Sequence, residues 1–145
     1  MRGTMADNSD YMKDLLKIPD SLTYETIQGQ IVGKANNYQA VPDKQGGKRI
    51  IKNAAIRQYE RSFQRQCSIY KDKQINKPFV LIVHVFESKL SYDLDNALKT
   101  LLDCLQYVRA VTNDNLCVGI KATKHIDRQQ PRITFALQEV EPRLF

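Results

Sequence analysis

The stretch from Phe79 to Phe86 constrains the fold of this chain more than any other. Apart from His84, every residue in it is aliphatic or aromatic, and most are β-branched or aromatic. A run of this length and composition, preceded by Pro78, is typical of a strand that is buried on both faces. We therefore expect the central strand of a sheet here. His84 shares a face with apolar neighbours, so we interpret it as a hydrogen-bonded core residue, not as a metal ligand.

Two amphipathic helices are predicted, one before this strand in the sequence and one after it. The first begins at Asn53, a residue suited to cap a helix, and runs to about Tyr70. Its apolar face comprises Ile56, Tyr59, Phe63, Cys67 and Tyr70. The second opens at Asp93, and its apolar stripe comprises Leu94, Leu98, Leu101, Leu102, Leu105 and Val108. Because both stripes follow the helical period, each helix is expected to bury one face.

Three further strands complete the predicted sheet. Residues 22–32 carry a mixed strand pattern that Gly29 interrupts as a bulge. Residues 116–122 and 132–137 read as two strands joined in a hairpin. The order of elements predicts an α+β fold, a single small domain with a mixed sheet of about four strands and two main helices.

Two segments are expected to lie outside these elements. Residues 34–49 read as a long loop, because they contain the turn formers Asn36-Asn37, Pro42-Asp43 and Gly46-Gly47. Residues 1–21 are interpreted as an N-terminal extension with a short helix that Pro19 ends. Within it, residues 1–4 precede a second methionine and are left out of the fold prediction. The domain itself is expected to span 22–145.

The charge of the chain points to an anionic partner. The chain has 145 residues, which fits one domain, and a formal net charge of +6. Such an excess of Lys and Arg favours polyanions, and charge that only keeps the protein in solution is the alternative. No apolar run is long enough to span a membrane, and the N-terminus lacks the apolar core of a secretory signal. We expect a cytoplasmic protein with no membrane partner.

The three cysteines, Cys67, Cys104 and Cys117, are widely spaced and form no Cys-x-x-Cys pair. Because the chain has only two histidines, neither a zinc site nor a disulfide framework is expected. Each cysteine falls in an apolar pattern, so we predict buried, reduced thiols.

Two acidic residues flank Leu94 at the start of the second helix. If Asp93 is still extended, the carboxylates of Asp93 and Asp95 point to one side while Leu94 points into the core. Two like charges in a small volume are unfavourable unless a cation compensates them, and Mg²⁺ prefers such oxygen ligands. Lys99 follows Asp95 by four residues and lies on the same side of the helix. The alternative is a purely structural pair at a favourable helix N-terminus.

The run Asp93-Leu94-Asp95-Asn96, followed by Lys99, an apolar helix and Asp114 at the start of a strand, resembles the RusA family of Holliday junction resolvases. These are small nucleases often carried by prophages. Upstream, Asn36-Asn37-Tyr38 resembles the family's turn after its first strand. The resemblance covers roughly residues 25 to 137. It implies a RusA-like fold and a homodimer that resolves four-way branched DNA in recombination and repair.

The resemblance also implies roles for individual residues. Asp93, Asp95 and Asp114 would bind Mg²⁺, with Mn²⁺ as a substitute, and Lys99 would join them in catalysis by stabilising the scissile phosphate. Lys124 is similar to a basic position on the family's following strand. Asn113 departs from the pattern, because the family often has an acid there. A second departure is Lys89-Leu90-Ser91-Tyr92, which stands in place of an arginine cluster.

Basic residues outside the acidic motif suit contact with a nucleic-acid backbone. They lie in the predicted loop and on one ridge of the first helix, and an ordinary solvated surface is the alternative. The DNA contacts expected from the sequence and the resemblance are Asn36, Asn37, Lys48, Arg49, Lys52, Arg57, Arg61, Lys89 and Lys124.

The function predicted from these features is Mg²⁺-dependent phosphodiester hydrolysis at four-way junctions. Two alternatives remain open at this point. The first is a non-catalytic, structure-selective DNA-binding protein whose acids are structural. The second is a metal-dependent flap or RNA nuclease that uses the same acids.

Overall fold

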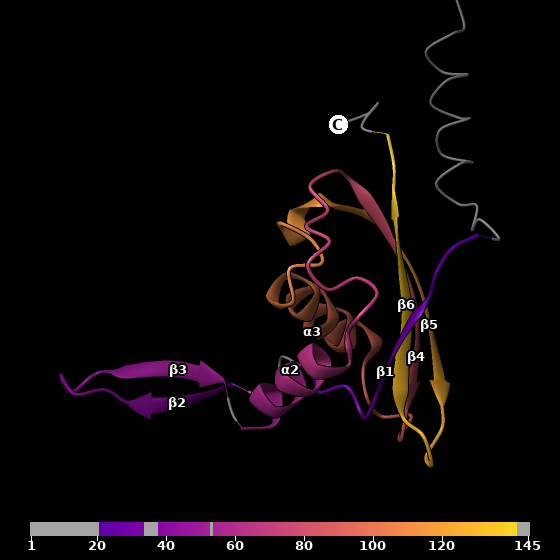
Figure 1. Cartoon of the computed structure of the whole chain (residues 1–145). Coiled ribbons are helices and arrows are strands. Elements are labelled where there is room, and N and C mark those ends of the chain that lie inside the picture. Colours follow the sequence, from indigo (N-terminus) through magenta and orange to yellow (C-terminus); the bar gives the residue numbers. More distant parts are fainter. Residues whose placement is uncertain (1–20, 34–37, 53, 142–145) are drawn as a thin grey trace, which may run out of the picture.

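The main body is a four-stranded mixed sheet with two helices on one face (Figure 1). The computed structural model describes residues 21–33, 38–52 and 54–141. The sheet has the order β1-β6-β4-β5, formed by β1 (Glu25–Gln28), β4 (Phe79–Glu87), β5 (Cys117–Ile126) and β6 (Arg132–Glu139). β4 pairs parallel with β5 and antiparallel with β6. The predicted α+β class and the central place of β4 are confirmed.

β4 is buried on both faces, as its composition predicts. Phe79, Leu81, Val83 and Val85 point to the helices and form the core with them. On the opposite face Val80 and Ile82 are also buried. His84 lies on that second face and is only half-buried. Its Nδ1 lies 2.6 Å from Thr123 Oγ1 on β5, so the predicted hydrogen bond is present, although the ring is not part of the core.

The helices α2 (Ala54–Gln66) and α3 (Leu94–Tyr107) cover one face of the sheet, and every residue predicted on their apolar faces is buried or half-buried. α2 ends before the predicted Tyr70. The Glu25 carboxylate explains this early end, because it accepts the backbone N–H groups of Ser68, Ile69 and Tyr70 at 2.7 to 3.1 Å. A continuing helix would direct these N–H groups to its own preceding turn.

The prediction that β5 and β6 form a hairpin is wrong. Both strands pair with β4, which lies between them, and the connection from Asp127 to Pro131 crosses the end of β4. The Asp127 N–H donates to the Glu87 carbonyl at 2.9 Å, which joins this connection to the last residue of β4. The reason is the burial of β4, because a strand with two apolar faces is most stable between two neighbours.

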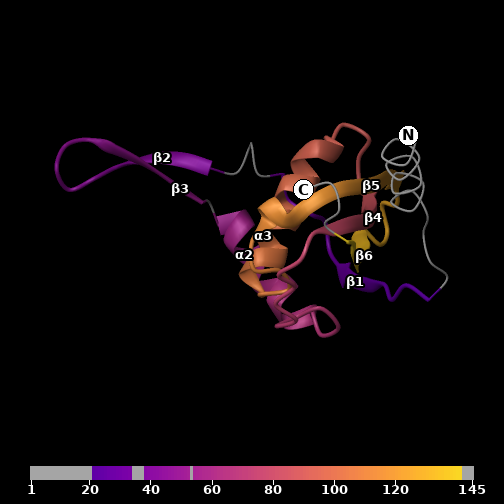
Figure 2. The same ribbon diagram turned by 90° about the horizontal axis from the view of Figure 1, so that it is seen from above.

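The prediction of a long loop over 34–49 is also wrong in part. β2 (Tyr38–Pro42) and β3 (Lys48–Lys52) form an antiparallel hairpin that extends away from the body of the protein (Figures 1 and 2). We call this hairpin the arm. Its turn does contain the predicted turn formers, because Asp43 Oδ1 accepts the N–H groups of Gln45 and Gly47, and Gly46 has φ +86°. These turn formers obscured two short strands in the sequence.

The remaining predictions have mixed outcomes. Cys67 and Cys104 are buried, Cys117 is half-buried, and no disulfide joins these three residues of the described part of the chain. Within the described ranges, no helix is long and apolar enough to cross a membrane. The predicted N-terminal helix, the Asn53 cap and the Asn36-Asn37 turn lie outside the described residues.

We predict that Glu25→Gln lowers the free energy of unfolding by about 2 to 4 kcal/mol, because an amide cannot satisfy all the N–H groups that the buried carboxylate accepts. Urea denaturation at pH 7 measures this change, with Glu139→Gln on the exposed end of β6 as the control. Equal losses in the two variants would contradict the assignment.

The pH dependence of the Glu25 effect has a definite sign. Burial raises the pKa of Glu25, but the hydrogen bonds from Ser68, Ile69 and Tyr70 outweigh burial and hold it below the ordinary value of 4.5. The stabilisation is therefore complete above pH 4.5 and is lost as the pH falls through the lower pKa of the folded state. The difference in stability between wild type and Glu25→Gln should shrink over that range.

Candidate functional site

The carboxylates of Asp93 and Asp95 lie at the start of α3, where the chain leaves β4. Asp93 is the N-cap residue and has the extended backbone that the prediction required, with φ −80° and ψ 132°. Asp95 lies in the first turn, and Leu94 between them packs against the core. An N-cap aspartate commonly accepts an N–H of its own helix. Asp93 makes no such bond to α3, all of which is described, so helix capping does not explain its exposed carboxylate.

Lys124 holds the loop that leads to Asp93. Its Nζ donates to the carbonyls of Leu90 and Tyr92, each at 2.9 Å. The parallel register brings it there, because Lys124 pairs with Val85 near the end of β4 and lies on the same face of the sheet. The structure thus brings Lys124 to the predicted site. Its ammonium contacts the protein itself, so its first role is to fix the backbone just before the acidic motif.

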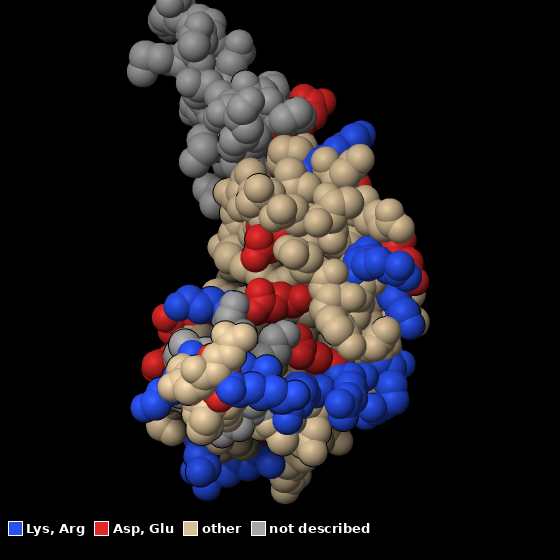
Figure 3. Space-filling model, turned by 90° about the vertical axis from the view of Figure 1, so that its left-hand side faces the viewer, with Lys and Arg blue, Asp and Glu red and all other residues tan. Residues whose placement is uncertain are grey.

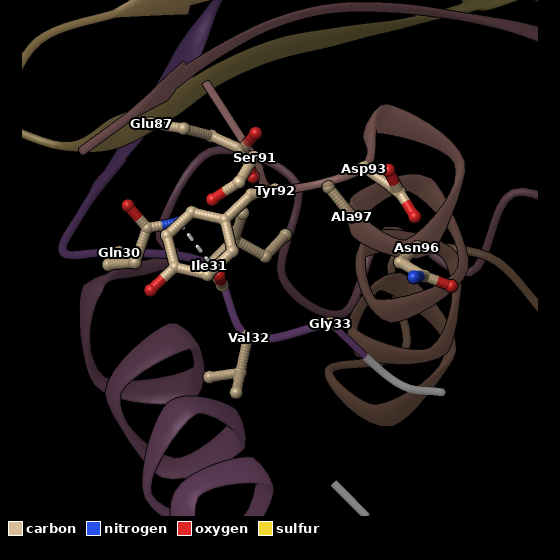
Figure 4. A pocket seen from close by; sticks show the side chains of 10 residues that line it. All are labelled: Gln30, Ile31, Val32, Gly33, Glu87, Ser91, Tyr92, Asp93, Asn96 and Ala97. Carbon is tan, nitrogen blue, oxygen red and sulfur yellow. Dashed lines mark hydrogen bonds between the residues drawn. The ribbon is translucent and has the colours of Figure 1, made fainter. Parts of the chain in front are cut away.

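A cavity of about 320 Å³ lies beside this loop (Figure 4). One wall is the segment Gln30–Gly33, which follows β1, and the other includes Glu87 and residues between Ser91 and Ala97. Two contacts hold the walls together. The Thr100 hydroxyl on α3 donates to the Val32 carbonyl at 2.6 Å. The backbone at Gly33 also passes so close to Asn96 that an added Cβ would lie 3.3 Å from Asn96 Cβ. Segments far apart in the sequence therefore meet beside Asp93.

Glu87 is the site residue that the sequence analysis missed. It is the last residue of β4, and its side chain is 1% exposed. Burial raises its pKa, and the negative charge of Asp93 raises it further, while Lys124 and a hydrogen bond from Gln30 act in the opposite direction. Glu87 and Asp93 line the same cavity. The available sequence signal was an acid at the end of an otherwise apolar strand, directly before the acidic motif.

Asp114 lies far from Asp93 in the same chain. It begins the short helix η1 (Asp114–Leu116), just before β5, whose first residue pairs with Phe79 at the start of β4. Asp93 instead follows the end of β4, and α3 separates the two acids. A helix of 14 residues is about 20 Å long. Among the described residues no three His, Cys, Asp or Glu side chains come together as a metal site, so within one chain neither Asp114 nor Glu87 completes a cluster of three carboxylates with Asp93 and Asp95.

The hydrogen bonds around Asp114 stabilise the local fold. Its N–H donates to Gln106 Oε1 at 2.9 Å, which connects η1 to the last turn of α3. Asn113 caps η1, because its Oδ1 accepts the Asn115 N–H at 3.0 Å. A carboxylate could accept the same bond, so the position where the family often has an acid retains a capping function here.

Most of the predicted basic DNA contacts are exposed. Lys48 and Arg49 lie on the arm, Arg57 and Arg61 on the solvent side of α2, and Lys89 in the loop before Asp93. Lys99 is exposed on α3, one turn after Asp95. Figure 3, which faces the arm, shows acidic side chains near the middle of this side of the molecule and a band of Lys and Arg side chains next to them. Asn36, Asn37 and the Lys52 side chain lie outside the described residues.

The site suits a hard divalent cation. Side chains with carboxylate, amide and hydroxyl oxygens line the cavity, namely those of Glu87, Asp93, Gln30 and Ser91, and a buried oxygen of Glu87 has no partner among the described residues. Mg²⁺ is commonly bound by one or two carboxylates together with waters and substrate phosphates. The residues present therefore fit such an ion on the Asp93 side, without Asp114 of the same chain.

Comparison with known proteins agrees with this chemistry. The family model described as endodeoxyribonuclease RusA matches residues 28–138, from the last residue of β1 almost to the end of β6. The match includes Glu87, the acidic motif, α3 and Asp114. No curated protein matches the chain significantly. Since the family match covers well over half of the 145 residues, the chain belongs to the endodeoxyribonuclease RusA family.

Proposed function

We propose that this protein is a Mg²⁺-dependent endonuclease that resolves four-way DNA junctions by two symmetric phosphodiester cleavages. Membership of an endodeoxyribonuclease family supports the nuclease activity. The single observation that favours a catalytic role for the acidic motif is the state of Asp93. Its exposed carboxylate makes no bond to the helix that it caps, and it lines a cavity together with Glu87, a buried acid.

In this proposal Asp93 and Asp95 hold the metal from the N-terminal end of α3. A divalent cation bound there lowers the pKa of a coordinated water and stabilises negative charge on the phosphate. Lys99 adds a positive charge on the same side of the helix, where the pentavalent phosphorane develops its charge. Lys124 keeps the loop before Asp93 in place through two carbonyl contacts. The cation could equally be Mn²⁺, which accepts the same oxygen ligands.

We propose that Asp114 joins the site from the partner subunit of a homodimer. In one chain α3 separates Asp114 from Asp93. Across a two-fold axis, two antiparallel copies of α3 would place the N-terminal end of one helix beside the C-terminal end of the other. Asp114 of the partner subunit would then lie near Asp93 and Asp95. Such a dimer has two equivalent sites, which suits a substrate that needs two symmetric cuts.

The arm and α2 are proposed to bind the DNA backbone. Their exposed basic residues include Lys48, Arg49, Arg57 and Arg61. Positive side chains that contact phosphates release counterions, so binding through them depends steeply on salt concentration. The arm extends from the body on the side of the helices, which suits a long, charged substrate better than a small molecule (Figure 2).

Asp95→Asn is expected to slow junction cleavage at least roughly 100-fold, because it removes a proposed metal ligand. Junction binding should stay the same or tighten, since one repelling charge is lost. Cleavage of an immobile four-way junction with Mg²⁺ and gel-shift binding measure the two effects. Asp72→Asn is the matched control, because Asp72 is an exposed acid that pairs with Arg109. Cleavage by Asp95→Asn at the wild-type rate would refute the assignment.

The same assay separates the alternatives. If wild type binds the junction but neither Mg²⁺ nor Mn²⁺ produces any cut, the protein is a DNA-binding protein without catalysis. If flap DNA or RNA is cut faster than the four-way junction, the nuclease has another substrate.

The shared site is tested by co-expressing Asp95→Asn and Asp114→Asn chains. Each variant alone should be inactive. A mixed dimer would combine both changes in one site and leave the other intact, so nicking of one junction strand should return. If each site belonged to a single chain, the mixed dimer would have no intact site. Sedimentation of wild type as an active monomer would also exclude the dimer.

Lys124→Met is expected to slow cleavage roughly tenfold, because the loop before Asp93 loses its two hydrogen bonds and the acid loses its position. The salt dependence of junction binding should not change. A direct phosphate contact would instead lower the slope of log K against log salt by about 0.9. Lys124→Arg should recover part of the rate, and Lys121→Met on the opposite face of β5 is the control.

A further inference from the structure

Glu87 combines two properties that are costly together. Its side chain is 1% exposed, and its Oε2 has no hydrogen-bond partner among the residues that the structure describes. A buried carboxylate is unfavourable unless a counter-charge or several donors satisfy it. The polar groups nearby bond the backbone: Gln30 Nε2 donates to the Ile31 carbonyl, and the Lys124 ammonium donates to the carbonyls of Leu90 and Tyr92. The Glu87 oxygen is left for another ligand.

Glu25, a second buried acid, shows what a purely structural carboxylate looks like in this protein. It is 3% exposed, and both of its oxygens accept hydrogen bonds from Ser68, Ile69 and Tyr70 at 2.7 to 3.1 Å. The Cys67 thiol also donates to it, at 3.2 Å. Glu25 therefore has its donors within the fold. Glu87 is equally buried but lacks such a set, so it does not share this structural explanation.

The unpartnered oxygen belongs to a residue that lines the cavity next to Asp93. Figure 4 shows the Glu87 side chain at the upper end of the cavity, beside Ser91, with Gln30 below it and Asp93 at the start of α3, where the Asp93 carboxylate points away from Glu87. The Gln30 amide is itself oriented, because its Oε1 accepts the Ser88 N–H at 2.8 Å and its Nε2 donates to the Ile31 carbonyl at 2.9 Å. The backbone at the end of β4 is thus fixed around the carboxylate.

We propose that Glu87 is a ligand of the divalent cation and binds it together with Asp93 in this cavity. The inference rests on the proposed function and adds to it an inner, buried ligand that the acidic motif does not contain. An ion between Glu87 and Asp93 compensates both negative charges and gives the buried oxygen its partner. Waters and a substrate phosphate complete the oxygen ligands on the open side.

The position of Glu87 suits this role. It ends the most buried strand of the sheet, and the Asp127 N–H fixes its carbonyl from the neighbouring connection. Asp93 and Asp95, in contrast, are exposed at the N-terminal end of α3. Glu87 would therefore set the depth at which the ion binds, while the exposed acids face the DNA.

The test measures metal binding without DNA, so it does not depend on cleavage. Mn²⁺ affinity of the full chain is measured by titration calorimetry, together with the rise in melting temperature on adding Mn²⁺ or Mg²⁺. Glu87→Gln is expected to weaken Mn²⁺ binding roughly tenfold or more and to lose most of the rise in melting temperature. Asp72→Asn is the control. It removes an acid far from the cavity, and asparagine tolerates the left-handed backbone at φ 61°.

In EDTA, Glu87→Gln should melt at the wild-type temperature or above it, because the amide lacks the charge that burial disfavours. A second measurement uses unmodified protein in case the variant folds poorly. Substoichiometric Mn²⁺ should broaden the NMR signals of the Gln30 side-chain amide and the Ser91 backbone amide. The signals of Gln138, which pairs with Val80 near the other end of β4 and does not line the cavity, should stay sharp.

Two results would overturn the inference. One is wild-type Mn²⁺ affinity in folded Glu87→Gln, and the other is broadening near Asp95 without any at Gln30. The proposed function fails separately. If Mn²⁺ binds through Glu87 but the wild-type protein cuts no branched DNA, the metal site stands and the nuclease assignment falls. If wild type cuts junctions and Glu87→Gln binds Mn²⁺ normally, the nuclease stands and the Glu87 ligand falls.

Discussion

The burial of β4 on both faces is the constraint on which the rest of the structure depends. A strand with two apolar faces needs a neighbour along each edge, and β5 and β6 provide them. The connection between β5 and β6 must then cross the end of β4, where it bonds the Glu87 carbonyl. As a result, the last residues of β4, the loop to α3 and the Lys124 ammonium on β5 meet at the same end of the strands.

The crossover through α3 follows from the same arrangement. Because β5 runs parallel to β4, the chain has to return along the whole sheet, and α3 makes this return. The return places Asp93 and Asp95 at one end of the strands and Asp114 at the other end. An arrangement that keeps Asp93 and Asp114 apart in one chain is an obstacle to a single-chain metal site. In the proposed two-fold dimer, the same separation would bring Asp114 of one subunit to Asp93 of the other.

Two of the buried acids, Glu25 and Glu87, show how the fold tolerates charge in different ways. Glu25 is satisfied by backbone donors and ends α2, so its charge stabilises the domain. Glu87 is only partly satisfied, and its pKa is raised by burial and by Asp93. In a chain of net charge +6, a partly satisfied acid beside exposed acids is a local exception. Exceptions of this kind are typical of ligand sites, because the missing partner arrives with the ligand.

The sequence by itself determined the central strand, both helices and the Asp93-Leu94-Asp95 motif, because these depend on local periodicity and on residue type. The short strands of the arm were hidden by their turn formers. The prediction of a hairpin between β5 and β6 was wrong because the order of strands depends on burial in the whole sheet. β4 is the most buried strand and lies between them. Only the tertiary structure decided that Lys124 bonds the loop before Asp93, that Glu87 lines the same cavity as Asp93 and that Asp114 lies beyond the other end of α3. These positions depend on strand register and on the direction of α3.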